Sequence, residues 1–343
     1  MIRKIFQKII IVFLSTTVCI LFLEISLRFY NSFFEVIESS TANEISFQNF
    51  ANDNNSNKAH IYDPEIGWSL KPDYNKHGIK INKDGFRSTI EESILDVKQP
   101  KILILGDSMV FGKFVKQNEI FSEKLNAKQN EIMYVNTGVI GYSTLQEYLV
   151  LKKNISVSNI KLVILFHTLA NDMWTNVKPG NFNPTASLKH GQLKFSKPSN
   201  IKTIPFYKRT MLYRFADKNL LYGRDLKYLF YRFDFEINAA QSYVWKVQSK
   251  LIQKMSNLTK KSSIPFIIVD IPTRNQLNKI AKSQKRQDLM RQLCEDNNIN
   301  YYSLMEFYPK NWLDLFIKKD THWNNIGHTF IAKFIENIVL ENI

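Results

Sequence analysis

Short apolar segments rich in β-branched residues alternate with helix-like segments from residue 101 to the end of the 343-residue chain. Strands are expected at 102–105, 132–136, 162–166 and 265–271, with a short fifth strand at Tyr301. The helix-like segments cover about 118–128, 144–154, 276–297 and 324–340. Strands that are apolar along their whole length are typical of parallel sheets covered on both faces. The sequence therefore predicts a three-layer α/β/α domain built on a parallel sheet.

The composition is that of a globular protein with a strong positive charge. Hydrophobic residues make up 44% of the chain, and 46 lysines and arginines against 31 acidic residues give a net charge of +15. Such a charge attracts polyanions, so nucleic acids, anionic lipid headgroups and acidic glycans all have to be considered as partners. Cys19 lies in an apolar run and Cys294 is left without a partner, which excludes a disulfide framework.

Residues 1–28 are expected to form a cytoplasmic tip and a membrane-spanning signal anchor. Ile9 to Leu23 carries no charge, and the apolar character resumes after Glu24. With the flanking apolar residues, the run reaches the roughly 20 residues that a spanning helix needs. Three basic residues precede it and orient the amino terminus inward: Arg3, Lys4 and Lys8. The alternatives are a cleaved signal peptide, for which no clear cleavage site follows, and a buried core helix.

Three further segments follow the anchor. Residues 29–59 are polar and rich in Asn and Ser, and we expect a stalk. Residues 60–100 contain short extended stretches punctuated by Pro and Gly, which predict a small β-rich cap segment laid against the main domain. Residues 101–343 form the expected α/β domain, with an insertion at about 173–261.

The insertion is the least readable part of the sequence. Prolines and glycines recur from Pro179 to Pro205, which predicts a loop. Residues 206–235 interleave aromatic and basic side chains. This pattern fits a helical hairpin that packs its aromatic residues on the core, a surface that touches a membrane, or a platform that stacks bases.

A strand that breaks into a tight turn is the first candidate for chemistry. The strand at 102–105 ends in Gly106, Asp107 and Ser108. Ligands of open α/β sheets bind at the carboxyl ends of the strands, so Ser108 is a candidate nucleophile. The alternative is an ordinary β-turn in which Asp107 caps the turn and Ser108 is solvated.

The base that such a serine needs stands near the carboxyl terminus. A hydroxyl attacks poorly until a base removes its proton, and the base needs a partner that orients its ring. Asp320 and His322 are two residues apart, so their side chains project to the same side of an extended segment. Asn324 is a good N-cap, which places the pair in the loop before the terminal helix. The alternative is a solvated aspartate and a histidine that only packs.

Four short blocks, taken in order, resemble those of the SGNH (GDSL-type) hydrolase superfamily. They are the Gly-Asp-Ser turn, VNTGVIGYST, LANDMW and DTHWNNIGH. The anchor, the segments DPEIGWSLKPDYN and INKDGFRS, and the spelling GDSMVFG further resemble a bacterial, membrane-anchored branch. The resemblance covers about residue 60 to the carboxyl terminus without the insertion. It implies a flavodoxin-like sheet and an anchor in the bacterial cytoplasmic membrane. The basic residues before the apolar run predict that the catalytic domain faces outward from this membrane.

The resemblance also implies a role for each matched residue. Ser108 matches the nucleophile and His322 the general base. The oxyanion hole is implied at the Ser108 turn, the Gly141 backbone N–H and the Asn171 side-chain amide. Gly141 competes with an ordinary turn role and with the nearby Gly138, and Asn171 with a loop cap.

Two positions depart from the family pattern. Leu169 stands where the third block usually carries a glycine, which can reshape the pocket. Lys319 stands where many members carry the triad aspartate, so that role is expected of Asp320. If Asp320 does not act, the site is a Ser-His dyad.

The expected function is a membrane-anchored serine esterase that removes O-acyl groups, acetyl foremost, from a cell-surface glycan or lipid. No cofactor is expected, and no His, Cys or acidic spacing suggests a zinc site. The alternatives are acyl transfer to envelope polysaccharide at the same site and a catalytically silent module that binds an anionic envelope polymer. Nucleic-acid binding is not expected, because no recognition module accompanies the charge. The oligomeric state and the role of the insertion stay open.

Overall fold

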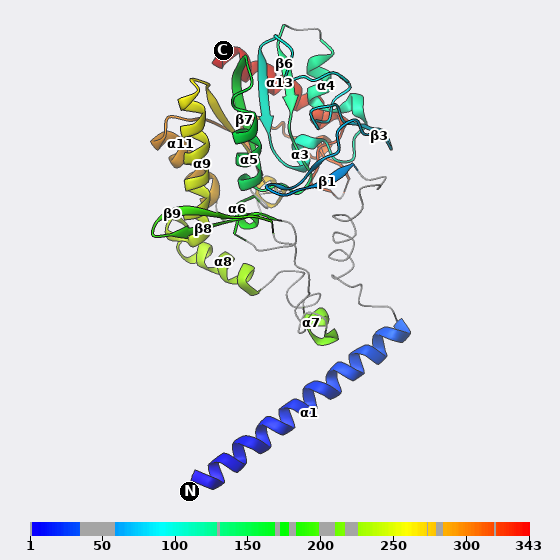
Figure 1. Cartoon of the computed structure of the whole chain (residues 1–343), viewed down its shortest axis with the longest axis vertical. Helices are drawn as coiled ribbons and strands as arrows, with labels where there is room; N and C mark the ends of the chain where they lie inside the picture. The colour runs from blue at the N-terminus through cyan, green and yellow to red at the C-terminus, as the bar shows by residue number, and fades with distance from the viewer. Residues whose placement is uncertain are drawn as a thin grey trace. The chain divides into compact units, whose positions relative to one another are not determined.

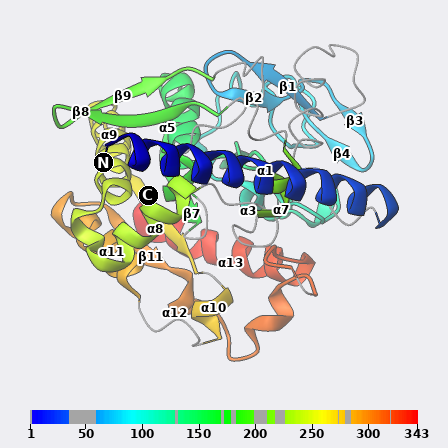
Figure 2. The same cartoon turned by 90° about the horizontal axis from the view of Figure 1, so that it is seen from below.

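The computed structural model of the chain is shown in Figures 1 and 2. It describes residues 2–34, 59–128, 131–168, 172–177, 183–198, 210–216, 226–272, 274–278, 284–318 and 320–343. The chain divides into two compact units. The smaller comprises residues 1–53 and 200–230, and the larger comprises residues 54–199 and 231–343. Most of the expected stalk lies outside the described residues.

The larger unit is built on a five-stranded sheet in which every neighbouring pair is parallel. Its strands are β5 (Lys101–Leu105), β6 (Met133–Asn136), β7 (Ile160–Thr168), β10 (Phe266–Ile271) and β11 (Asn300–Ser303). Their order in space is β6-β5-β7-β10-β11, which is 2-1-3-4-5 in chain order. This is the flavodoxin-like, doubly wound arrangement. The predicted fold class is confirmed.

Helices cover both faces of this sheet (Figures 1 and 2). One layer contains α4 (Phe121–Asn126) and α13 (Asn325–Asn342), which contact each other. The other contains α5 (Thr144–Asn154) and α9 (Tyr243–Lys261), with α11 (Lys285–Asp296) beside β11. Asn324 accepts a hydrogen bond from the Gly327 N–H, so it is the N-cap of α13, as predicted. The helix expected at 276–297 consists of two helices, α10 (Arg274–Leu277) and α11.

Helix α9 belongs to the covering layer, although its sequence lies in the expected insertion. Its apolar side chains recur at helical spacing, and the buried ones include Val244, Val247, Leu251 and Met255. These side chains face α5 and β10. Within the described residues, the insertion therefore ends before Tyr243, where α9 resumes the alternation of strands and helices.

The expected loop in the first half of the insertion contains a β-hairpin. Strands β8 (Thr185–Lys189) and β9 (Gln192–Ser196) pair antiparallel. The two residues between them, His190 and Gly191, both have positive φ, at 50° and 74°. A two-residue turn of this kind matches the twist of a hairpin, so Gly191 lies in the turn that connects the two strands. The prediction of a loop was therefore wrong for residues 185–196.

The cap segment (residues 60–100) begins with an antiparallel pair, β1 (His60–Asp63) and β2 (Gly67–Leu70). A second short pair follows, β3 (Asn75–Lys76) and β4 (Ile79–Lys80). The remainder is irregular and is held by the Asp84 carboxylate, which accepts from the Ser93 hydroxyl and the Ile94 N–H. These pairs agree with the expected β-rich character of the segment.

The smaller unit contains α1 (Ile2–Phe34), α7 (Met211–Ala216) and the first residues of α8 (Leu226–Ile237). Within the described residues, one helix is long and apolar enough to cross a membrane, at Phe6–Phe29 of α1. Glu24 interrupts this stretch, but its carboxylate accepts from Arg28 Nε and from the N–H groups of Met211 and Leu212. The charge is thus paired with a cation and with the first turn of α7.

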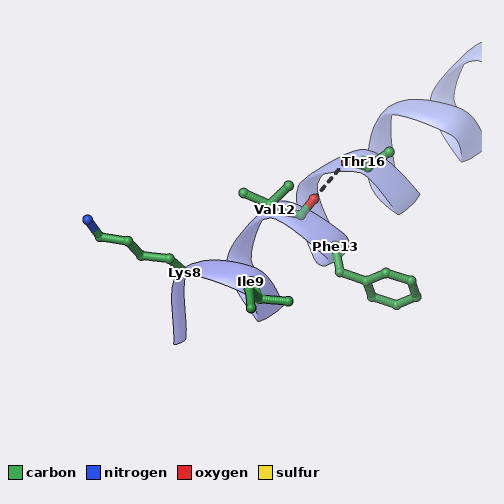
Figure 3. Close-up of a pocket in the computed structure, with 5 residues that line it drawn as sticks. All are labelled: Lys8, Ile9, Val12, Phe13 and Thr16. Carbon is green, nitrogen blue, oxygen red and sulfur yellow. Dashed lines mark hydrogen bonds between the residues drawn. The ribbon is translucent and has the colours of Figure 1, made fainter. Parts of the chain in front are cut away.

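A shallow hollow on α1 lies among Lys8, Ile9, Val12, Phe13 and Thr16 (Figure 3). All five side chains come from one helix. The Thr16 hydroxyl donates to the Val12 carbonyl at 2.7 Å, which satisfies a polar group that lipid could not. The hollow contains no pair of catalytic groups, so the candidate site is elsewhere.

Candidate active site

The turn that carries Ser108 lies at the switch point of the sheet. The helices after β5 and β6 cover opposite faces, so a crevice opens at the carboxyl ends of the central strands. Ser108 begins the short helix α3 (Ser108–Phe111) directly after β5, and its side chain is half-buried. Asp107 caps α3 by accepting from the Met109 N–H at 2.8 Å. The capping part of the β-turn alternative is therefore present, but the serine is not simply solvated.

Close packing explains the glycine before the turn. A Cβ at Gly106 would lie 2.3 Å from the Val110 side chain. The strand can therefore pass directly into α3 only if residue 106 has no side chain. This approach holds Ser108 at the edge of the sheet.

The side chains of Ser108, His322 and Asp320 form a continuous hydrogen-bonded relay. His322 Nε2 is 2.8 Å from Ser108 Oγ. On the other side of the ring, Nδ1 is 2.5 Å from Asp320 Oδ1. The two-residue spacing of Asp320 and His322 therefore brings both side chains together, as the sequence predicts.

The loop before α13 holds this pair in place. The Ile317 N–H donates to the His322 carbonyl, and the Asp320 N–H donates to the Ile317 carbonyl. Next to His322, Trp323 is 1% exposed and its indole N–H donates to the Tyr308 hydroxyl at 2.9 Å. His322 thus lies in a loop that is held by its own backbone hydrogen bonds and anchored by the buried Trp323 ring.

Asp320 is held as a carboxylate. Partial burial alone would raise the pKa of Asp320, but the hydrogen bonds from the His322 ring and backbone N–H lower it below its ordinary value. An ionised Asp320 accepts the proton on His322 Nδ1, which leaves Nε2 as the acceptor that faces Ser108 Oγ. This is the tautomer that a general base needs.

Gly141 and Gly138 have different roles in the second block. Gly138 packs against α3, since a Cβ there would lie 2.5 Å from the Phe111 nitrogen. Its N–H donates to the Asn136 side chain at 3.0 Å. Gly141 is exposed, with φ of +82°, and among the described residues its N–H meets no acceptor. Of the two, Gly141 is the one with a donor left for a ligand.

Asn171, Leu169 and Lys319 lie outside the described residues. The next residue after Asn171 is described, and its carboxylate, that of Asp172, accepts from the Thr168 N–H at 2.7 Å. Burial and the neighbouring carboxyls raise the pKa of Asp172 and of Glu147 well above their ordinary values. Both side chains are fully enclosed, and among the described residues neither Glu147 oxygen has a hydrogen-bond partner. The fold therefore favours their neutral forms.

Three residues outside the four sequence blocks stabilise the segments around the site by hydrogen bonds: Trp68, Arg87 and Gln248. Arg87 of the cap segment, 1% exposed, donates to the carbonyls of Phe111, Gly112 and Val115. Trp68 donates to the Ile140 carbonyl and so fastens the Gly141 loop. Gln248 of α9 donates to the Thr144 hydroxyl and accepts from the Asn176 amide. The only sequence signal for Arg87 and Trp68 was their place in the two cap-segment motifs, and Gln248 had none.

The described residues can also be searched for groups of side chains that could bind a metal ion. Among the residues that the structure describes, no three His, Cys, Asp or Glu side chains gather closely enough to bind a metal ion. The proton transfers of a Ser-His-Asp relay need only the side chains of this chain.

His328 leads us to expect a loss of stability in acid. Its ring is 1% exposed and stacks on Phe121, and Nδ1 accepts from the Phe121 N–H at 3.4 Å. Burial and the nearby charges of Arg87 and Lys124 lower the pKa of His328 to about 3. Between about pH 6.5 and pH 3 the folded state therefore binds fewer protons than the unfolded state, and the free energy of unfolding falls by roughly 1.4 kcal/mol for each unit by which the pH is lowered.

The variant His328→Asn removes this titration and keeps an acceptor for the Phe121 N–H. Urea unfolding of the wild type and the variant between pH 7 and pH 4 should give a shallower slope for the variant, by about one proton. His77→Asn in the exposed β3–β4 turn should leave the slope unchanged. Equal slopes for wild type and His328→Asn would contradict the assignment.

Comparison with known proteins gives similarity only at the level of fold. No protein-family model and no curated protein matches the sequence. The chain is similar to a member of the lipolytic protein G-D-S-L family from Veillonella parvula, at 14% identity and a TM-score of 0.37, over 68% of this chain and 94% of that one. It is also similar to the esterase EstA from Pseudoalteromonas sp., at 12% identity and a TM-score of 0.39, over 70% and 97%.

A third similar structure is the acetyl xylan esterase AlAXEase, at 17% identity and a TM-score of 0.38, over 70% of this chain and 99% of that one. All three similarities have identities below 25% and TM-scores below 0.5. Their similarity is too low to assign chemistry, which therefore depends on the residues described above.

Proposed function

We propose that the chain is an SGNH-type serine esterase, anchored in the membrane by α1, that removes O-acetyl groups from a cell-envelope glycan or lipid. The observation that supports this most is the relay from Ser108 Oγ through His322 to Asp320, with distances of 2.8 and 2.5 Å. In this arrangement a serine hydroxyl can lose its proton as it attacks.

The first half of the proposed reaction forms an acyl-enzyme. Ser108 Oγ attacks the carbonyl carbon of the ester while its proton moves to His322 Nε2. The carbonyl oxygen becomes an oxyanion, which accepts from the Gly141 N–H and from the Ser108 N–H, with the Asn171 amide as a further expected donor. Preorganised donors of this kind contribute roughly 100- to 1000-fold in rate each. The tetrahedral intermediate then expels the alcohol, which takes the proton from His322 Nε2.

The second half releases the acid. A water molecule gives a proton to His322 Nε2 and attacks the acyl carbon, and Ser108 leaves with that proton when the intermediate collapses. Asp320 stays ionised throughout and stabilises the imidazolium in both halves. A sugar hydroxyl in place of the water would make the same site an acyltransferase.

Acetate release from an O-acetylated oligosaccharide by the full-length chain in detergent tests this function. Free acetate in the presence of water alone is the expected result. Acetate that appears instead on an added unacetylated oligosaccharide would assign acyl transfer. If neither product forms and p-nitrophenyl acetate is also stable, the catalytic proposal is wrong and the silent binding module is favoured.

In a deletion strain, the acetyl content of the envelope glycan separates the same alternatives. A rise points to an esterase and a fall to a transferase. We propose that the catalytic unit faces outward, because the basic residues before the apolar run favour a cytoplasmic amino terminus.

A further inference from the structure

One aromatic side chain beside the site is both strained and exposed. Phe114 has a φ of +71°, in the left-handed region that bulky residues avoid, and it is 63% exposed. Burial therefore does not compensate for the backbone strain. Strained residues of this kind persist only where the surrounding structure holds them, and they concentrate at functional sites.

The turn that carries Phe114 is held from the cap segment. The buried Arg87 guanidinium donates to the carbonyls of Phe111 and Gly112 before Phe114 and of Val115 after it. The N–H of Lys113 donates to the Ser108 carbonyl at 3.1 Å, which ties the turn to the nucleophile. The backbone of the turn that carries Phe114 is thus held relative to Ser108 by several hydrogen bonds.

The ring itself lies next to the general base. The ring centroids of Phe114 and His322 are 5.5 Å apart, with an interplanar angle of 88°. The Lys113 ammonium lies 4.5 Å from the Phe114 centroid, over one face of the ring. With 63% of the residue exposed, the ring keeps surface that a bound molecule can cover.

The chemistry of the site identifies which part of an ester meets this face. His322 Nε2 takes the proton of Ser108 and then gives it to the departing alcohol, so the alcohol oxygen has to lie beside His322. The carbonyl oxygen faces the oxyanion donors, and the acyl chain is a separate substituent of the carbonyl carbon, on the side away from the alcohol. A ring in contact with His322 is therefore on the alcohol side of the ester.

We propose that Phe114 is the binding platform for the alcohol half of the ester, and that this half is a sugar ring whose flat, CH-rich face covers the exposed phenyl ring. This inference rests on the proposed esterase or transferase function. It makes Phe114 a specificity-determining residue that distinguishes sugar esters from esters of small open-chain alcohols. In acyl transfer, the acceptor sugar would occupy the same platform.

Four esters test the platform: ethyl acetate, ethyl butyrate, and the 6-O-acetyl and 6-O-butyryl esters of methyl glucoside. The variant Phe114→Asn removes the ring and keeps a residue that tolerates positive φ. Its kcat/KM should fall roughly fivefold to tenfold further for the two sugar esters than for the two ethyl esters, whichever acyl group they carry. Phe114→Trp, which keeps an aromatic ring, should keep the wild-type preference for sugar esters.

Phe233→Asn is the matched control, because Phe233 is 65% exposed on α8 and the mechanism gives it no role. It should leave all four values unchanged. A loss in Phe114→Asn that tracks the acyl chain would place the ring in the acyl pocket, and an equal loss on all four esters would make it only a support for His322. Either result overturns the proposal. A thermal midpoint of Phe114→Asn several degrees below that of the wild type would also overturn it, because the ring would then stabilise the folded state. A wild type that cleaves none of the four esters would overturn the proposed function itself.

Discussion

Replacing Ser108 by alanine is expected to lower kcat for p-nitrophenyl acetate by about 10,000-fold or more. The physical reason is that no other group in the relay can form the acyl-enzyme, since His322 Nε2 faces Ser108 Oγ at 2.8 Å. The residual rate should be that of an unassisted oxyanion site, because the Gly141 N–H is unaffected. The measurement is steady-state turnover of the full-length chain in detergent.

Ser249→Ala serves as the control for this variant. Ser249 lies on α9, and its hydroxyl donates to the Lys246 carbonyl of the same helix. Its turnover should equal that of the wild type. Turnover of Ser108→Ala within tenfold of the wild type would mean that hydrolysis occurs elsewhere in the molecule.

The second large effect is expected from Asp320→Asn, which should lower kcat by roughly 100- to 10,000-fold. The carboxylate accepts the proton on His322 Nδ1 at 2.5 Å, whereas an amide can turn an N–H toward that nitrogen and stabilise the wrong tautomer. Because hydrogen bonds from His322 lower the pKa of Asp320, the wild-type carboxylate stays ionised across neutral pH. The rate loss should therefore persist from about pH 6 to pH 9.

Asp314→Asn is the matched control in the neighbouring turn. Asp314 is exposed and accepts from the Asn311 amide at 2.8 Å, away from the relay. A loss of less than tenfold in Asp320→Asn, with Asp314→Asn at the wild-type rate, would assign the chemistry to a Ser108–His322 dyad. The comparison thus separates the triad from the dyad left open by the sequence.

The relay could be predicted from the sequence because each of its members lies in a contiguous motif. Asp320 and His322 share one short loop, so their spacing alone placed both side chains on one side. The Gly-Asp-Ser turn comes directly after a fully buried strand, which fixed Ser108 at a strand end. The two motifs were joined by the need of a serine for a base and by their order among the four blocks, and the apolar β-branched strands predicted the parallel sheet.

Residues that act at long range could not be predicted in the same way. Arg87 reaches carbonyls 24 to 28 positions away, and Gln248 reaches Thr144 over 104 positions. No local pattern encodes such contacts, because they depend on how the cap segment and α9 pack. The choice between Gly138 and Gly141 likewise needed the structure, because the close approach of Gly138 to Phe111 and the hydrogen bond of its N–H to Asn136 are not visible in the sequence.

The prediction of a loop in the first half of the insertion was wrong for a related reason. Gly191 and the surrounding prolines are equally compatible with a loop and with a hairpin, and the positive φ at His190 decides between them. The apolar spacing of α9 was visible in the sequence, but its burial depends on α5 and β10. Local sequence patterns therefore predicted the candidate catalytic residues better than they predicted where the insertion begins and ends.

The most direct test of the central claim, that Ser108 is a nucleophile activated by His322, is labelling with a fluorophosphonate probe and subsequent peptide mass mapping. We predict one covalent adduct, on the peptide that contains Ser108, and a labelling rate that falls at least about 100-fold in His322→Gln. A preparation that hydrolyses esters while Ser108 stays unlabelled, or whose adduct lies on another residue, would contradict the account.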